Sequence, residues 1–234
     1  MKNIKFITDS MIMHRGFFDN DKIIENTIKA FKKSNTNCHP YELDVRFTKD
    51  EKVVVFHDDT LKRLSNINKK VSSLTYEELK SIKLLNVDTI PLFEDVLKLD
   101  NKYGIIIEIK NDDNNMKLCD EVLRLLKDYN KPYAIISFNK DTLKYIRSKD
   151  SNILLGLLIG FRKEKPLYRL SSRMFIKTFK PDFISINKRE VNYRYIRKFK
   201  EKKPVLIWTI KTREDFNKYK ELGTNLVLEN INMI

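Results

Sequence analysis

The sequence predicts an α/β fold of the (β/α)8 type, in which β-strands and α-helices alternate. Short apolar runs of strand length are followed by segments whose apolar residues recur at helical spacing. Several of the runs are rich in Val and Ile, as strands buried on both faces are. The chain has 234 residues, about the size of one barrel domain. We therefore expect a single domain over residues 1–234.

Eight apolar runs are the expected strands of a parallel sheet. They cover residues 12–15, 41–47, 104–110, 133–138, 153–159, 183–187, 205–210 and 226–228. A further run at 53–57 indicates an extra strand or an extension beyond the second one. Eight strands with interleaved helices favour a closed barrel, with an open sheet as the alternative that a count leaves standing.

Helical stretches are expected between these strands. Residues 116–129 have apolar side chains at 118, 122, 125, 126 and 129, which form one helical face. The other expected helices cover residues 25–33, 75–82, 93–99, 142–147, 191–200 and 214–222. Gly223 follows the last of them, where glycine commonly ends a helix.

The positive charge of the chain is concentrated in one stretch. The net charge is +14, and residues 161–203 carry 15 Lys and Arg against 4 Asp and Glu, a net of +11. The stretch lacks the basic and aromatic motifs of RNA-binding domains and the Cys and His pairs of zinc fingers, so we expect no nucleic-acid partner. Two alternatives remain: a bias of composition towards Lys, Asn and Ile, or attraction to a negatively charged partner, either peripheral contact with an anionic membrane or a phosphorylated substrate.

Other features indicate a cytoplasmic protein. No run of about 18 apolar residues is present, and residues 1–16 carry Asp9 and Arg15 and lack the apolar core of a signal peptide. Cys38 and Cys119 lie 81 residues apart and fit no metal-ligand spacing. We expect both to be reduced thiols.

Three acidic residues interrupt the expected strands and are candidate metal ligands. Glu42 and Asp44 are two residues apart on one strand and point to the same side, and Glu108 lies in another strand. Buried acids are rare without compensation. Each could pair with an Arg or Lys at the rim of the barrel, but three acids on two strands favour a divalent cation, which takes oxygen ligands.

Two of the three histidines stand where a strand passes into a loop. His14 ends the first strand and His57 ends the run after the second, and catalytic residues of barrels lie at such strand ends. Histidine titrates near neutral pH and suits acid–base chemistry. His39 precedes Pro40 and the second strand, and we assign it a structural role. Gly16 permits a tight turn that a ligand can approach.

Arg15 and Lys110 supply positive charge beside these acids. An Arg fork and a Lys point charge match a phosphate, and pairing with the neighbouring carboxylates is an alternative that can hold at the same time. Trp208 is the only tryptophan. Its spacing fits the core and a wall of the substrate site equally well.

A set of short motifs in a fixed order carries a family resemblance. The motifs are His14-Arg15-Gly16, Glu25-Asn26-Thr27, Glu42-Leu43-Asp44-Val45, Thr48-Lys49-Asp50, His57-Asp58 with Thr60-Leu61 and Arg63, Ile90-Pro91-Leu92 before Phe93–Leu97, Ile107-Glu108-Ile109-Lys110 and Trp208-Thr209. The chain resembles the glycerophosphodiester phosphodiesterases, and the resemblance runs from about residue 12 to about residue 223. His-Arg-Gly alone would be weak evidence, whereas the ordered set is specific.

The resemblance implies a (β/α)8 TIM barrel with a short insertion after the second strand. It implies one divalent metal ion, Mg²⁺ or Ca²⁺, held by Glu42, Asp44 and Glu108, and it implies His14 and His57 as the acid–base pair. The implied reaction splits small-molecule glycerophosphodiesters, the deacylated phospholipids, into glycerol 3-phosphate and an alcohol.

The sequence also departs from the family pattern. Ile24 stands where a proline usually precedes Glu-Asn-Thr, and the insertion between Arg63 and Ile90 is short. Residues 228–231 replace the usual Thr-Asp and proline at the end of the last strand. No implied metal or acid–base position is lost, which argues against a non-catalytic phosphate-binding module. A lysophospholipase D acting on lysophospholipids at a membrane surface is the alternative activity.

Overall fold

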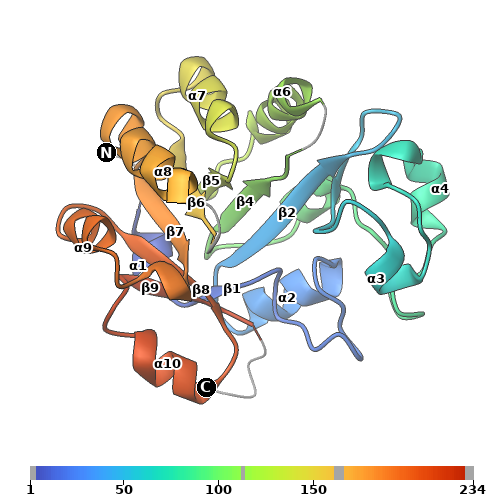
Figure 1. The fold of residues 1–234 in the computed structure, drawn as a ribbon. Helices are drawn as coiled ribbons and strands as arrows, with labels where there is room; N and C mark the ends of the chain where they lie inside the picture. Colours follow the sequence, from blue (N-terminus) through green and yellow to red (C-terminus); the bar gives the residue numbers. More distant parts are fainter. Residues whose placement is uncertain (1–3, 112–113, 161–165, 230–234) are drawn as a thin grey trace.

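The computed structural model describes residues 4–111, 114–160 and 166–229, and it shows a parallel β-barrel surrounded by helices (Figure 1). Within these residues the barrel strands are β1 (Ile12–Met13), β2 (Tyr41–Phe47), β4 (Ile105–Ile109), β5 (Tyr133–Ser137), β6 (Leu154–Ile159), β7 (Phe183–Asn187), β8 (Val205–Ile210) and β9 (Asn225–Leu228). Strand β1 pairs in parallel with both β9 and β2, which closes the ring. The expected (β/α)8 barrel is confirmed, and the open-sheet alternative is wrong.

Alternation along each strand separates the barrel interior from the layer under the helices. The inward side chains form one apolar cluster with Ile7, which lies in the short helix α1 (Lys5–Thr8). Phe183 fills the interior beside Gly156, where a Cβ atom would lie 2.4 Å from the Phe183 ring. The outward side chains pack under the helices in a second, larger cluster. Because the interior is filled, a ligand site can form only at the C-terminal strand ends, from the inward-pointing residues there.

The helices of the outer layer follow their strands around the barrel (Figure 1). They are α2 (Ile28–Thr36), α5 (Phe93–Leu97), α6 (Asn115–Leu126), α7 (Lys140–Lys149), α8 (Pro166–Phe179), α9 (Arg194–Lys200) and α10 (Arg213–Tyr219). Helix α2 begins three residues later than the helix expected at 25–33. The side chain of Thr27 accepts a hydrogen bond from the backbone N–H of Ala30 and so caps the helix, and Asn26 has a φ of 58° that no α-helix contains.

Helix α8 was not expected from the sequence. Its buried face carries Ser172 and Phe175, whereas Leu167, Leu170 and Met174 are exposed. Apolar side chains therefore lie on two sides of this helix, one side buried against the barrel and the other exposed. Residues 161–165 of the basic stretch lie outside the described residues.

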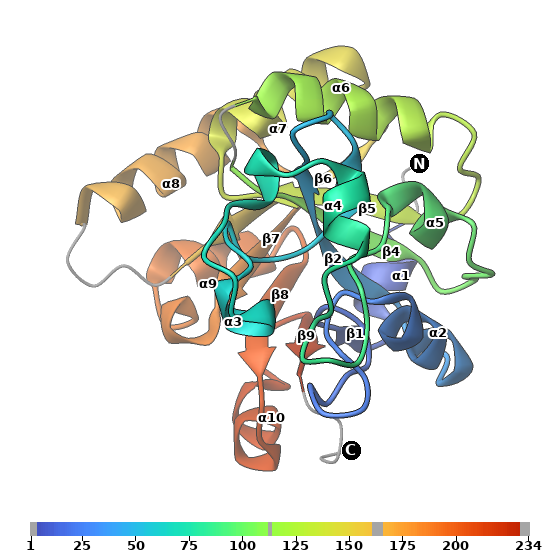
Figure 2. The same cartoon turned by 90° about the vertical axis from the view of Figure 1, so that its right-hand side faces the viewer.

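The insertion after β2 forms a small lobe at one edge of the barrel (Figures 1 and 2). Strand β3 (Val53–Val55) pairs antiparallel with the end of β2. Helices α3 (Lys62–Ser65) and α4 (Tyr76–Lys80) follow, with a 3-10 turn at Val71–Ser73 between them. The lobe has its own apolar cluster. The extra strand is confirmed, and it ends two residues before His57, which therefore lies in the loop beside the barrel mouth.

Two smaller findings concern the cysteines and the helices. Cys38 is exposed and Cys119 is buried, and both are unpaired thiols, as expected. No helix within the described ranges is long and apolar enough to cross a membrane.

Candidate active site

The three acids meet inside the barrel mouth because their strands are neighbours in register. Asp44 on β2 pairs with Glu108 on β4, and Glu42 shares the inward side of β2 with Asp44. All three are buried. One carboxylate oxygen from each lies within 4.8 Å of the others. This spacing lets one cation contact all three oxygens.

Two cations also pair with this cluster. Lys110 Nζ lies 3.2 Å from Asp44 Oδ1 and 2.8 Å from Glu108 Oε1. Arg15 Nε lies 3.3 Å from Asp44 Oδ2. The pairing of Arg15 and Lys110 with the neighbouring acids, one of the two alternatives given by the sequence, is therefore present. Both cations contact Asp44, whereas only Lys110 contacts Glu108.

Charge compensation is uneven across the three acids. Burial raises the pKa of Asp44, but Lys110 and Arg15 outweigh burial and hold that pKa well below its usual range. Burial raises the pKa of Glu108 to about 7, with Lys110 opposing the rise. Burial and the charges of Asp44 and Glu108 raise the pKa of Glu42 well above its usual range.

Glu42 is the least compensated of the three. Among the described residues it accepts one hydrogen bond, at 3.2 Å from the backbone N–H of Arg15, and the nearest basic side-chain nitrogen to its carboxylate is His14 Nε2 at 4.0 Å. A buried carboxylate in this position stays charged only with a further positive charge. The donor set therefore fits a divalent metal ion.

His14 extends from the end of β1 into the mouth, and Glu229 holds its ring. His14 Nδ1 lies 3.1 Å from Glu229 Oε2. A carboxylate only accepts, so Nδ1 carries the proton and Nε2 faces Glu42 as a free base. Burial lowers the pKa of His14, and the charge of Arg15 lowers it further. His14 is thus a neutral imidazole at neutral pH.

His57 approaches the mouth from the loop after β3. Its Nδ1 lies 2.6 Å from Asp58 Oδ1, and Arg63 Nε donates to the other Asp58 oxygen at 2.6 Å. The guanidinium of Arg46 donates to the His57 carbonyl at 2.9 and 3.0 Å. Both the ring and the backbone of this histidine are therefore held in place.

Two residues of the Glu-Asn-Thr motif support the site, although the sequence assigns them no role. Glu25 accepts from Arg15 Nη1 at 2.7 Å and from both Nη atoms of Arg63 at 2.7 and 2.8 Å. Burial raises the pKa of Glu25, but these cations outweigh it and bring the pKa to about 2. The Asn26 amide donates to Asp44 Oδ2 at 2.8 Å. Only their place in the Glu-Asn-Thr motif could have identified Glu25 and Asn26 from the sequence, because their contacts are with residues of other segments of the chain.

Glu229 was also missed. It follows the last strand, where the sequence departs from the family pattern, and Asn230 and Ile231 lie outside the described residues. Besides His14, its carboxylate accepts a hydrogen bond from Lys211 at 2.5 Å. Burial raises the pKa of Glu229, but the bonds from His14 and Lys211 outweigh it and lower the pKa to about 2. Glu229 is therefore a charged acceptor for His14.

The structure also places His39 and Gly16. His39 precedes β2 at its N-terminal end, away from the mouth, so the structural role assigned to it remains the better interpretation. Gly16 has a φ of 82°, and a Cβ atom there would lie 2.8 Å from Ala30 Cβ. What approaches this glycine closely is helix α2.

A pocket of about 190 Å³ lies at the centre of these groups. Polar side chains form one part of it, including both histidines, Arg15, Glu42, Glu108 and Lys110. Apolar residues form the rest, and Trp208 is among them, with its ring edge-to-face against Phe138 at 5.9 Å. The pocket gathers every predicted site residue except Asp44, which is fully buried and contacts Arg15 and Asn26.

The fold and this site define a barrel enzyme that has acid–base groups, buried carboxylates and cations around one pocket at its mouth. The sequence model of the Glycerophosphoryl diester phosphodiesterase family matches residues 14–230. The chain belongs to this family, and it is a phosphoric diester hydrolase acting on glycerophosphodiesters.

The chain is also similar to individual proteins of known name or structure. A glycerophosphodiester phosphodiesterase of Caldanaerobacter subterraneus subsp. tengcongensis is 28% identical over 231 residues, covering 93% of this chain and 92% of its own. A lysophospholipase D of Rattus norvegicus is 36% identical over 139 residues, covering 53% and 43%. The structure of the Thermotoga maritima glycerophosphodiester phosphodiesterase has a TM-score of 0.76 at 27% identity and covers 94% of both chains. An Oleispira antarctica phosphodiesterase in complex with sn-glycerol-3-phosphate has a TM-score of 0.81 at 20% identity, covering 96% and 93%.

Proposed function

We propose that the chain hydrolyses glycerophosphodiesters to glycerol 3-phosphate and an alcohol, with His14 and His57 as the acid–base pair. The observation that carries the proposal is the single pocket lined by both histidines, buried carboxylates and two cations. The Oleispira antarctica relative binds sn-glycerol-3-phosphate, which is the product expected here. The proposed location is the cytoplasm, where thiols such as Cys38 and Cys119 stay reduced.

Glu42, Asp44 and Glu108 would hold one divalent metal ion, Mg²⁺ or Ca²⁺. When bound, the ion would supply positive charge against the phosphate and the negative charge that develops in the reaction. The weak charge compensation of Glu42 supports this assignment, because three ionised carboxylates so close together repel one another.

Arg15 and Lys110 would bind the phosphate. Both line the pocket while they pair with the acids. A lysine has three N–H donors, and Lys110 directs two of them to Asp44 and Glu108. The third is left for a phosphate oxygen.

The structure supports a division of roles between the histidines. His14 is neutral with Nε2 free, so we assign it as the base that takes the proton from the glycerol 2-hydroxyl. That oxygen attacks phosphorus, and His57 protonates the leaving alcohol. Water then opens the cyclic phosphate with the two roles reversed, which restores both histidines.

The test is kinetic. His14→Ala and His57→Ala should each lower kcat at least about a hundredfold. Because the two act in one proton relay, the double variant should be little worse than the poorer single variant. His39→Ala is the matched control, and it should change kcat little.

A substrate with a good leaving group separates the two roles. A nitrophenyl phosphodiester that keeps the 2-hydroxyl needs little protonation of its leaving group, so it should partly rescue His57→Ala and not His14→Ala. Near-normal kcat in both folded alanine variants would refute the mechanism. Rescue of His14→Ala alone would reverse the assignment.

A second candidate activity is that of a lysophospholipase D. Trp208 and Phe138 form part of an apolar wall of the pocket that could contact an acyl chain, and the Rattus norvegicus relative carries this name. Rates on glycerophosphocholine and lysophosphatidylcholine distinguish the two. Trp208→Ala should impair hydrolysis of the lysolipid more than that of the deacylated diester if the wall binds an acyl chain.

A further inference from the structure

The outer face of α8 carries an unusual row of apolar side chains. Leu167, Leu170 and Met174 are 77%, 53% and 59% exposed. They lie three and four residues apart and so share one side of the helix. The opposite side packs on the barrel through Ser172 and Phe175. The row is therefore not needed to attach α8 to the barrel.

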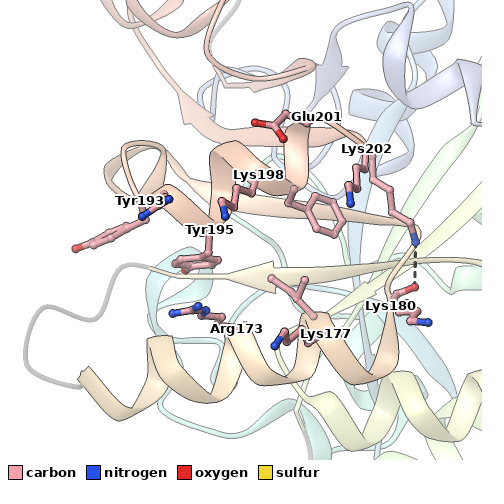
Figure 3. A pocket seen from close by; sticks show the side chains of 12 residues that line it. Arg173, Lys177, Lys180, Tyr193, Tyr195, Lys198, Glu201 and Lys202 are labelled. Carbon is pink, nitrogen blue, oxygen red and sulfur yellow. Dashed lines mark hydrogen bonds between the residues drawn. The ribbon is translucent and has the colours of Figure 1, made fainter.

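A basic groove lies between α8 and α9 (Figure 3). Two of its lining residues on α8, Arg173 and Lys177, follow Leu170 and Met174 by three positions and so lie next to the row. Its volume is about 980 Å³, and Ile176 and Phe199 line it between the two helices. Glu201 is the one acidic residue that lines it among the described residues. The groove also carries cations that have no ion-pair partner in the described part of the chain: Arg173, Lys177, Lys180, Arg194, Lys198 and Lys202.

We propose that this α8–α9 face, formed by the apolar row and the six cations, docks the enzyme on the surface of an anionic phospholipid bilayer. Such a surface has a layer of negatively charged headgroups above a layer of acyl chains, and the cations and the exposed Leu and Met side chains match these two layers. The cations would contact headgroup phosphates while the apolar row enters the boundary with the acyl chains.

Other occupants fit the face less well. Duplex nucleic acid would satisfy the cations but would leave Leu167, Leu170 and Met174 in water or against phosphate. A second copy of the chain could cover the apolar row, but it would bring six cations against six. An anionic bilayer satisfies both features at once.

The proposal goes beyond the catalytic assignment and does not depend on it. The groove and the active-site pocket share no lining residue. Variants of the α8–α9 face should therefore hydrolyse a water-soluble diester such as glycerophosphocholine at the unaltered rate. Failure of one proposal can thus be told from failure of the other.

Vesicle co-sedimentation of the full chain tests the proposal. Vesicles of phosphatidylcholine alone are compared with vesicles that also contain phosphatidylglycerol. Binding should require the anionic lipid and should fall as salt increases. Lys177→Gln with Lys198→Gln should weaken binding roughly fivefold for each cation removed. Lys102→Gln with Lys127→Gln, two exposed lysines outside the face, is the control with matched charge.

A second variant tests the apolar row. Leu167→Ser, Leu170→Ser and Met174→Ser together should weaken binding at least about tenfold, because each side chain loses burial in the bilayer. Leu85→Ser, Met116→Ser and Leu222→Ser together, all outside the face, form the matched control. Circular dichroism confirms that each variant is folded.

Several results would overturn the proposal. They are equal binding to neutral and anionic vesicles, unchanged binding in either face variant, and no vesicle binding at all. Light scattering shows whether the apolar row instead forms a dimer that the serine variant dissociates. A DNA shift assay shows whether the cations bind duplex in the absence of vesicle binding.

Discussion

Replacement of Glu25 by Gln should strongly destabilise the metal-free protein at neutral pH. The carboxylate is buried, 3% exposed, and it joins Arg15 of the first strand–loop junction to Arg63 of the insertion. Gln keeps the shape but removes the charge, which leaves two guanidinium groups facing a neutral amide. Removal of one partner from a buried ion pair commonly costs several kcal/mol.

The magnitude follows from the pKa of Glu25. A pKa of about 2 in the folded protein, against an ordinary value of 4.5, corresponds to about 3 kcal/mol of stability at pH 7. The folded pKa is the lower one, so this stability is fully present above the unfolded pKa and is lost as the pH falls towards the folded pKa. The difference between wild type and variant should therefore shrink by about 1 kcal/mol between pH 7 and pH 4.

Urea unfolding in excess EDTA, at several pH values, measures this difference. The chelator is needed because a bound metal would add stability of its own. Glu77→Gln on α4 is the control, since that carboxylate is 74% exposed and its loss should change stability by under about 0.5 kcal/mol. Equal stability of wild type and Glu25→Gln at pH 7, or a difference independent of pH, would refute the reasoning.

Two further predictions concern the catalytic groups. Excess EDTA should abolish hydrolysis, and added Mg²⁺ or Ca²⁺ should restore it. The metal site at Glu42, Asp44 and Glu108 would be contradicted by full activity in the chelator together with no metal found by elemental analysis. Glu229→Gln should lower kcat at least about tenfold, because His14 loses the charged acceptor that orients its ring. The negative charge of Glu229 raises the pKa of His14, so its loss should also move the acidic limb of the kcat/KM profile to lower pH. An unaltered limb would argue against His14 as the base.

The fold class and the candidate site residues can be predicted from the amino-acid sequence. Val- and Ile-rich runs mark buried parallel strands, so they locate the strands along the chain. Because side chains alternate between the two faces of a strand, the sequence also predicts which residues share a face. For the same reason Glu42 and Asp44 were predicted to share a side, and the structure confirms it. The His, Glu and Asp motifs lie on or beside these strands. Because the C-terminal ends of all strands of a parallel barrel lie at the same end, these residues are expected to meet there.

The hydrogen-bond partners and the pKa shifts of these groups depend on the three-dimensional structure. The contacts of Glu25 with Arg63 and of Glu229 with His14 join residues 38 and 215 positions apart. No local pattern encodes such pairs, since they depend on how loops converge after the barrel closes. The same holds for Glu42, whose raised pKa arises from its burial beside two acids. Helix α8 also needed the structure, because only the packed barrel shows which of its two apolar sides is buried.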